Sequence, residues 1–154
     1  MDRAVITAFA KAILDTFRTM LNAEVRATQV RDLQERIPGD GVHAIIGMNG
    51  EVEGACALTL RSDAAMRLTG SLLGEEVIEI DRLVVDAVQE INNVVIGAAK
   101  MYLSAAGLNF AFGLPKTMVG TMFATDEGPA FRNLGIRFQS DIADCLVNLS
   151  WKRG

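Results

Sequence analysis

Histidine is nearly absent from this chain of 154 residues, and cysteine, proline and aromatic residues are scarce. His43 is the only histidine, and Cys56 and Cys145 lie far apart without a Cys-x-x-Cys pair. The single histidine and the lack of a Cys-x-x-Cys pair argue against a structural zinc site and a Ser-His-Asp triad. We therefore assign no metal ligand or redox pair, and interpret His43 as a structural strand residue. The cysteines are expected to be buried free thiols, typical of a reducing cytoplasm.

A strong positive charge and long apolar runs are also lacking. The formal net charge is −4, which argues against nucleic acid or an anionic membrane as a partner. No stretch approaches the ~20 apolar residues of a membrane span, and the first residues do not resemble a signal peptide. Half of the residues are hydrophobic and 22% are charged. We expect one globular domain over residues 1–154, located in the cytoplasm.

The order of the predicted elements indicates an α+β fold, in which helices pack on an antiparallel β-sheet. Hydrophobic periodicity predicts helices over residues 3–21, 62–73 and 81–106. Shorter apolar segments predict strands over 24–33, 42–48, 52–60, 109–120, 135–139 and 142–151. Turns are expected at 37–41, at Asn49-Gly50 as a hairpin, and at 125–129.

Capping residues mark the expected helix ends. Ser62 or Asp63 is expected to cap the second helix, which Gly74 ends, and Asp81 to open the third. Four acidic residues precede or begin that third helix: Glu75, Glu76, Glu79 and Asp81. Favourable electrostatics at the start of a helix explains them, and a metal site is the alternative.

The long helix predicted from Asp81 has two unlike sides. Because an α-helix turns ~100° per residue, positions spaced four and three apart share one side. One narrow side carries polar or small residues: Asp86, Glu90, Asn93, Gly97, Lys100 and Ser104. The simplest interpretation is a solvated helix face. Asn93 and Gly97 disfavour helix, however, so the pattern favours a surface that another molecule approaches closely.

Glu90 and Asn93, three residues apart, are expected to project side by side. A carboxylate can pair with a cation, and a carboxamide can hold a water molecule in a fixed orientation. Asn93 cannot be a general base, because an amide takes up no proton at neutral pH. The pair therefore suits positioning, which is most of the catalysis of phosphoryl transfer.

At these residues the sequence resembles the CheC/CheX/FliY phosphatases of bacterial chemotaxis, and most of all their CheX branch. Glu90-Ile-Asn-Asn93-Val-Val-Ile-Gly97 is similar to the family signature Glu-x-x-Asn-x-x-x-Gly. Three other segments resemble the family in the same order: Gly47–Gly54, Leu72–Glu76 and Pro115–Gly120. The signature occurs once, as in CheX-type members, whereas CheC-type members typically carry two copies.

The resemblance implies a phosphatase that hydrolyses the aspartyl phosphate of a CheY-type receiver. Asn93 would orient the attacking water and Glu90 would pair with the receiver's lysine. The receiver would also supply Mg²⁺, so no cofactor of the protein's own is implied. Asp86, Gly97 and Lys100 are interpreted as partner-binding residues, with Gly97 giving clearance for close approach. The alternatives are a non-catalytic adaptor that binds receiver or motor-switch proteins, and a purely structural dimerisation domain.

A homodimer is the expected assembly. CheX-type members are known as homodimers that pair or exchange strands. In addition, Trp151 lies at the end of the last predicted strand, where a small single sheet would bury it with difficulty.

Overall fold

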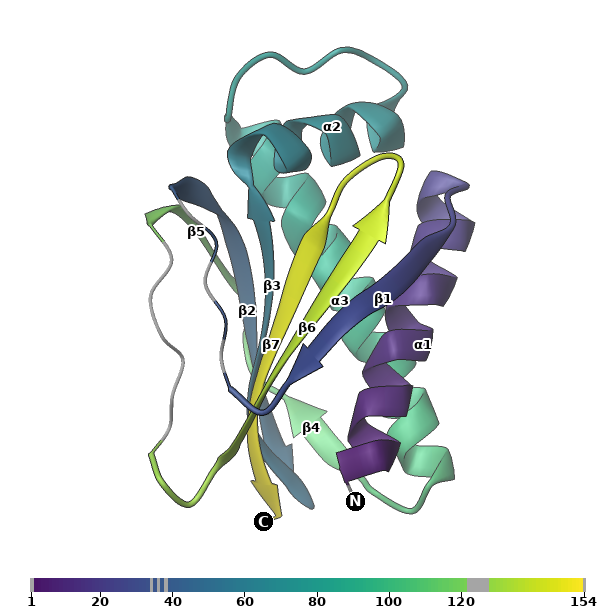
Figure 1. The fold of residues 1–154 in the computed structure, drawn as a ribbon, viewed down its shortest axis with the longest axis vertical. Coiled ribbons are helices and arrows are strands. Elements are labelled where there is room, and N and C mark those ends of the chain that lie inside the picture. Colours follow the sequence, from purple (N-terminus) through teal and green to yellow (C-terminus); the bar gives the residue numbers. More distant parts are fainter. Residues whose placement is uncertain (1, 34, 36, 38, 122–127, 154) are drawn as a thin grey trace.

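The computed structural model in Figure 1 describes residues 2–33, 35, 37, 39–121 and 128–153. Over these residues three helices and seven strands follow one another in the expected order of a helix, strands, helices and strands. The helices are α1 (Asp2–Leu21), α2 (Ser62–Leu73) and α3 (Arg82–Ala105). The strands are β1 (Val25–Arg31), β2 (Asp40–Gly50), β3 (Val52–Arg61), β4 (Phe110–Phe112), β5 (Lys116–Thr121), β6 (Arg132–Ser140) and β7 (Cys145–Arg153).

The strands form a sheet in which every pairing among the described residues is antiparallel. Their order is β1-β6-β7-β3-β2-β4, and β5 pairs with the same side of β2 as β4. β2 thus pairs with β5 over Asp40–Ile45 and with β4 over Met48–Gly50. The predicted α+β fold with an antiparallel sheet is confirmed.

The hydrophobic core lies between the sheet and two helices, α1 and α3, which Figure 1 shows on the far side of the strands. Alternate residues of the central strands point into it: Cys56, Leu58, Leu60, Val147, Leu149 and Trp151. The helices also contact each other, because the Tyr102 hydroxyl of α3 donates a hydrogen bond to the Asp15 carboxylate of α1. α2 crosses one end of the sheet (Figure 1).

Two of the predicted helix ends are confirmed and one is wrong. Asp81 caps α3, since its Oδ1 accepts hydrogen bonds from the Leu83 and Val84 amides at 3.0 and 3.3 Å. Gly74 ends α2 in a left-handed conformation with φ of 72°. The start of α2 differs from the prediction, because Arg61 occupies the N-cap position and no side chain caps it.

The predicted hairpin of β2 and β3 is confirmed, since the two strands pair antiparallel, but Asn49-Gly50 alone is not its turn. The β2–β3 register ends at Met48 opposite Gly54. Asn49 and Gly50 instead continue β2 as partners of β4. This pairing is possible because the backbone of β4 lies beside Asn49 and Gly50. The local sequence around Asn49-Gly50 does not indicate that β4 lies there.

Residues 109–120 also form two strands rather than the single predicted one. Gly113–Pro115 separate β4 from β5, since proline cannot donate a ladder hydrogen bond and restricts the residue before it. The predicted turn at 37–41 is partly replaced by β2, which begins at Asp40. Pro38 and residues 125–127 of the other predicted turn lie outside the described residues.

Trp151 does not support a homodimer in the way its sequence position suggested. Its side chain is only 2% exposed within the single chain. The expectation was wrong because β7 lies between β6 and β3, and the core covers its inner face. The homodimer stays a prediction.

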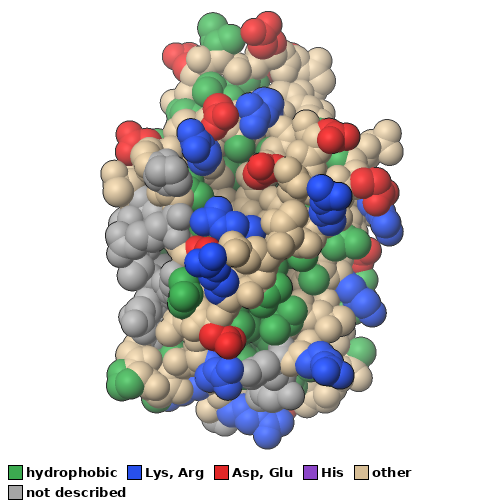
Figure 2. Space-filling model, in the orientation of Figure 1, with side chains coloured by type: hydrophobic (Ala, Val, Ile, Leu, Met, Phe, Trp, Pro, Cys, Tyr) green, Lys and Arg blue, Asp and Glu red, His purple; other side chains and the backbone are tan. Residues whose placement is uncertain are grey.

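Figure 2 shows the face of the sheet opposite α1 and α3, with Lys and Arg side chains spread over it and most of the visible Asp and Glu in the upper half. The top of that half corresponds to α2 and the segment after it in Figure 1. Within the described part of the chain, no helix combines the length and apolarity needed to cross a membrane.

Candidate functional site

α3 is amphipathic, and its packing decides which residues face outward. The side that contacts the core is fully buried at residues spaced four, three and four apart: Val84, Val88, Ile91 and Val95. Asp86, Glu90, Asn93, Gly97 and Lys100, here named the α3 stripe, lie on the other side. All of them are exposed except Asn93, which is half-buried. The predicted sidedness of this helix is confirmed.

A neighbouring residue that the sequence analysis missed holds α3 on the sheet. The side chain of Asn92 is 1% exposed, and its Nδ2 donates a hydrogen bond of 3.0 Å to the Ala44 carbonyl of β2. An asparagine on the apolar side of a helix was the available signal, because buried polar groups need partners. The bond ties the buried side of α3 to β2, and together with the packing of its apolar residues it leaves Glu90 and Asn93 facing outward.

Asn93 has one enclosed polar atom. Its Oδ1 is buried and makes no hydrogen bond to any of the described residues. A buried acceptor without a partner costs about 1–3 kcal/mol. The carboxamide is therefore not occupied by an internal hydrogen bond through this oxygen. Rotation about its terminal torsion, which is broad and roughly two-fold, can turn the oxygen outward.

The two acidic residues of the stripe differ in their surroundings. Glu90 is exposed and forms no ion pair with the described residues. Asp86 accepts a hydrogen bond of 3.1 Å from Arg82 Nε, one turn earlier. Such an exposed pair contributes at most about 1 kcal/mol. Of the two carboxylates, Glu90 is the one available to an incoming cation.

Nothing among the described residues requires glycine at position 97. A Cβ atom built at Gly97 would meet nothing within 4 Å. Glycine within a helix costs roughly 1 kcal/mol relative to alanine. The space beside Gly97 is open, and a molecule placed on the stripe could approach the helix backbone there.

Lys100 is held by an aromatic ring. Its Nζ lies 5.1 Å from the centre of the Phe112 ring of β4, within the range of a cation–π contact. The structure therefore brings the five candidate site residues onto one side of α3, with Lys100 leaning toward the strand that follows the helix.

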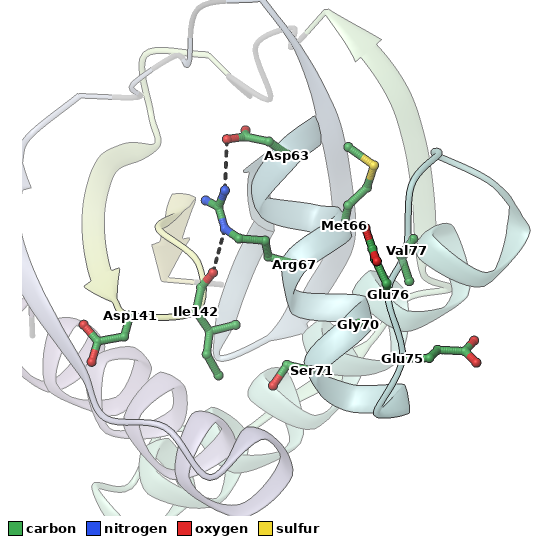
Figure 3. A pocket seen from close by; sticks show the side chains of 10 residues that line it. All are labelled: Asp63, Met66, Arg67, Gly70, Ser71, Glu75, Glu76, Val77, Asp141 and Ile142. Carbon is green, nitrogen blue, oxygen red and sulfur yellow. Dashed lines mark hydrogen bonds and ion pairs between the residues drawn. The ribbon is translucent and has the colours of Figure 1, made fainter.

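A hollow of the surface lies elsewhere, between α2 and the segment that follows it (Figure 3). It measures about 540 Å³ and contains no residue of the α3 stripe. Arg67, the one basic residue that lines it, donates to the Ile142 carbonyl at 3.0 Å and to Asp63 Oδ2 at 3.3 Å. Its guanidinium is therefore already engaged, and the hollow is not built around a free cation.

His43 and the cysteines have structural roles, as expected. His43 is buried, with Nε2 2.8 Å from the Gly120 carbonyl and Nδ1 3.2 Å from Thr59 Oγ1. Cys56 and Cys145 are buried free thiols, and burial raises the pKa of both. Among the described residues, no group of His, Cys, Asp or Glu side chains is arranged to hold a metal ion.

Comparison with known proteins places this site in a family. The family model described as chemotaxis phosphatase CheX matches residues 42–139, which include the whole of α3. The chain belongs to the CheX family. As a member of this family it is a phosphatase, and the predicted resemblance is confirmed.

The known proteins that this chain resembles are distant in sequence, and the solved structures among them are close in fold. The CheY-P phosphatase CheX of Thermotoga maritima is 22% identical over 121 residues, 78% of each protein. A CheC-like superfamily protein of Shewanella sp. PV-4 has a TM-score of 0.88 and 24% identity, covering 99% of both chains. A chain of the CheX–CheY–BeF3–Mg²⁺ complex of Borrelia burgdorferi has a TM-score of 0.81 and 23% identity, covering 96% of this chain and 97% of that one.

Proposed function

We propose that this CheX-family phosphatase hydrolyses the aspartyl phosphate of a CheY-type receiver domain. The Thermotoga relative is named a CheY-P phosphatase, and the Borrelia neighbour is part of a complex with CheY. The observation that carries the proposal is the position of Glu90 and Asn93 on one exposed side of α3. Neither the Glu90 carboxylate nor Asn93 Oδ1 is bound to another described residue.

In this proposal Asn93 positions the attacking water. With its oxygen turned outward, the carboxamide accepts a hydrogen bond from the water and directs it toward phosphorus, in line with the aspartyl oxygen that leaves. The water oxygen bonds to phosphorus, the bond from phosphorus to the aspartyl oxygen breaks, and the water proton passes to solvent or phosphate. The products are the receiver with an unphosphorylated aspartate side chain, and inorganic phosphate. Asn93 takes up no proton, so its contribution is alignment.

Glu90 sets the angle of docking. Its unpaired carboxylate is proposed to accept a hydrogen bond from the receiver's lysine, a charge-assisted contact that also fixes direction. The receiver brings the Mg²⁺ that neutralises the phosphoryl oxygens, and the phosphatase supplies no cofactor of its own. Gly97 gives the receiver room to reach the helix, while Asp86 and Lys100 make flanking contacts.

The test is phosphate release from a phosphorylated, Mg²⁺-loaded CheY-type receiver. Wild type should shorten the phosphate lifetime, and Asn93→Ala should lose about 10²-fold or more of this acceleration while still binding. Glu90→Ala should weaken binding as well. Glu53→Ala serves as the control, because Glu53 is a carboxylate on β3 outside the stripe. If wild type binds the receiver without changing the phosphate lifetime, the adaptor alternative replaces the proposal.

A further inference from the structure

Beside the α3 stripe runs a second element, residues 112–117, here named the flanking segment. It begins at the end of β4 and enters β5. Two residues of α3 contact it: Gln89, whose Oε1 accepts a hydrogen bond of 2.8 Å from Thr117 Oγ1, and Lys100, whose Nζ lies over the Phe112 ring. These contacts bracket Asn93, which is four residues after Gln89 and seven before Lys100. The three therefore share one side of the helix, and the flanking segment borders the Asn93 side of the stripe.

Glu90 lies on the opposite side of Asn93 from this segment. Gln89 and Glu90 are ~100° apart around the helix, and Asn93 falls between them. A partner seated on Asn93 would thus meet Glu90 along one border of the stripe and the flanking segment along the other.

The flanking segment is held at both ends and near its middle. Gly113 donates its amide to the Gly47 carbonyl of β2 at 2.9 Å, and Lys116 and Thr117 pair with β2 in the sheet. Pro115 restricts the backbone of the residue before it. Leu114 therefore stands on a backbone that is already ordered in the free protein.

The Leu114 side chain is almost fully exposed to solvent. Its exposure is 92%, higher than that of any other large hydrophobic side chain in the described part of the chain. An ordered apolar side chain in water is unfavourable alone but suits binding, because its burial is favourable and little backbone freedom is lost. Single exposed hydrophobic residues are common, so the argument rests on the combination of fixed backbone, near-complete exposure and a place beside Asn93.

We infer that Leu114 is an anchoring, specificity-determining contact for the receiver that docks on the α3 stripe, inserted against an apolar surface beside the receiver's phosphorylated aspartate. The inference rests on the proposed function, since it names a second contact for the same partner. Glu90 and Leu114 then contact the receiver on the two sides of Asn93. The polar contact selects the receiver's lysine, and the apolar contact discriminates among receivers by the surface beside their phosphorylation sites.

The test compares wild type with Leu114→Ser, Leu114→Met and the control Ile78→Ser. Ile78 is 82% exposed and lies between α2 and α3, outside the flanking segment. Two quantities are measured: steady-state dephosphorylation of the receiver, and the affinity for receiver loaded with beryllofluoride and Mg²⁺. We expect Leu114→Ser to raise KM and weaken binding about ten-fold or more, with kcat within about two-fold. Leu114→Met should retain most of the affinity, and Ile78→Ser should behave as wild type.

The outcomes separate this inference from the proposed function. Unchanged KM and affinity in Leu114→Ser, with a wild type that is active on the receiver, would overturn the anchor alone. A fall in kcat at constant affinity would also overturn it, because Leu114 would then act through Asn93 rather than on the partner. If wild type and Asn93→Ala release phosphate at the same rate while Leu114→Ser binds more weakly, the anchor stands and the proposed mechanism fails. Absence of receiver binding by wild type overturns both.

Discussion

The side-chain amide of Asn92 joins α3 to the backbone of β2, donating a hydrogen bond of 3.0 Å to the Ala44 carbonyl. The contact lies directly before Asn93 in the sequence and fully inside the core. Together with the buried apolar residues of α3, it holds the helix in the orientation in which the stripe residues project outward.

The effect of an Asn92 substitution on stability should depend strongly on which side chain replaces the amide. Asn92→Leu loses one hydrogen bond but also removes Oδ1, which is buried without a partner among the described residues. Its change in unfolding free energy should stay near ~1 kcal/mol. Asn92→Asp places a buried carboxylate against the Ala44 carbonyl and should cost about 3 kcal/mol or more at neutral pH. Denaturant unfolding at pH 7 measures both, and equal destabilisation would contradict the assigned role of the amide.

Alanine at Gly97 should raise stability and lower activity together. A Cβ there meets open space, so Gly97→Ala should stabilise the free protein by about 0.5–1 kcal/mol. The same methyl group would stand where the proposed receiver approaches, so phosphate release should slow. Thermal unfolding should show the rise in stability, and receiver dephosphorylation, measured on the same preparation, should show the fall in activity.

The matched comparison for Gly97 is Gly70, the glycine of α2. A Cβ at Gly70 would lie 2.7 Å from the Glu75 carbonyl oxygen, so Gly70→Ala should destabilise the protein. If both variants shift stability in the same direction, the difference in space around the two positions does not determine the effect of alanine on stability.

Stability at alkaline pH should depend on Tyr102. Its hydrogen bond to Asp15, then partial burial and the charge of Asp15, raise the pKa of the Tyr102 hydroxyl above its ordinary value of 10.0. The folded state therefore favours the protonated phenol. This contribution is complete below pH ~10 and is lost as the pH rises through the raised pKa.

The check is denaturant unfolding of wild type and Tyr102→Phe at pH 8 and pH 11. Wild type should be the more stable protein at pH 8, and its advantage should shrink at pH 11, where the phenolate would face the Asp15 carboxylate. An advantage that stays constant or grows with pH would contradict the assignment.

Both cysteines should resist alkylation in the folded protein. Burial, and secondarily the charge of Asp144, raises the pKa of Cys145 to about 12, and burial raises the pKa of Cys56 as well. At pH 8 a thiol with that pKa is roughly 10⁻⁴ ionised, and the thiolate is the reactive form. Iodoacetamide at pH 8 should modify neither thiol in native protein and both in guanidinium. Rapid native labelling at either position would show that its surroundings open.

Periodicity was sufficient to predict the two sides of α3, and hence the outward position of Glu90 and Gly97. The buried and exposed residues alternate at spacings that only a helix places on opposite sides. Asn93 was predicted less well, because its Oδ1 is enclosed although the residue belongs to the exposed stripe. That detail depends on neighbours from other elements.

Contacts between distant segments explain what the sequence did not reveal. Gln89 and Thr117 are separated by 28 positions, and nothing local indicates that they meet. The same holds for Trp151, whose burial depends on β7 pairing on both sides, with β3 and with β6. Strand order is decided by the whole set of pairings, whereas hydrophobic patterning describes one strand at a time.

The insertion of β7 between β6 and β3 has a consequence for synthesis of the protein. β3 pairs with β7, a strand roughly 90 positions later. β1 can pair only after β6 has been synthesised, since Val25 lies opposite Ser140. Until the ribosome has released β7, the nascent chain holds two incomplete sheets, each with an open edge. The pairings of β3 with β7 and of β1 with β6 therefore form late, which favours slow folding and exposes those edges to other chains in the meantime. Deletion of Cys145–Arg153 would remove the strand that joins both halves and would leave β3 and β6 as open edges.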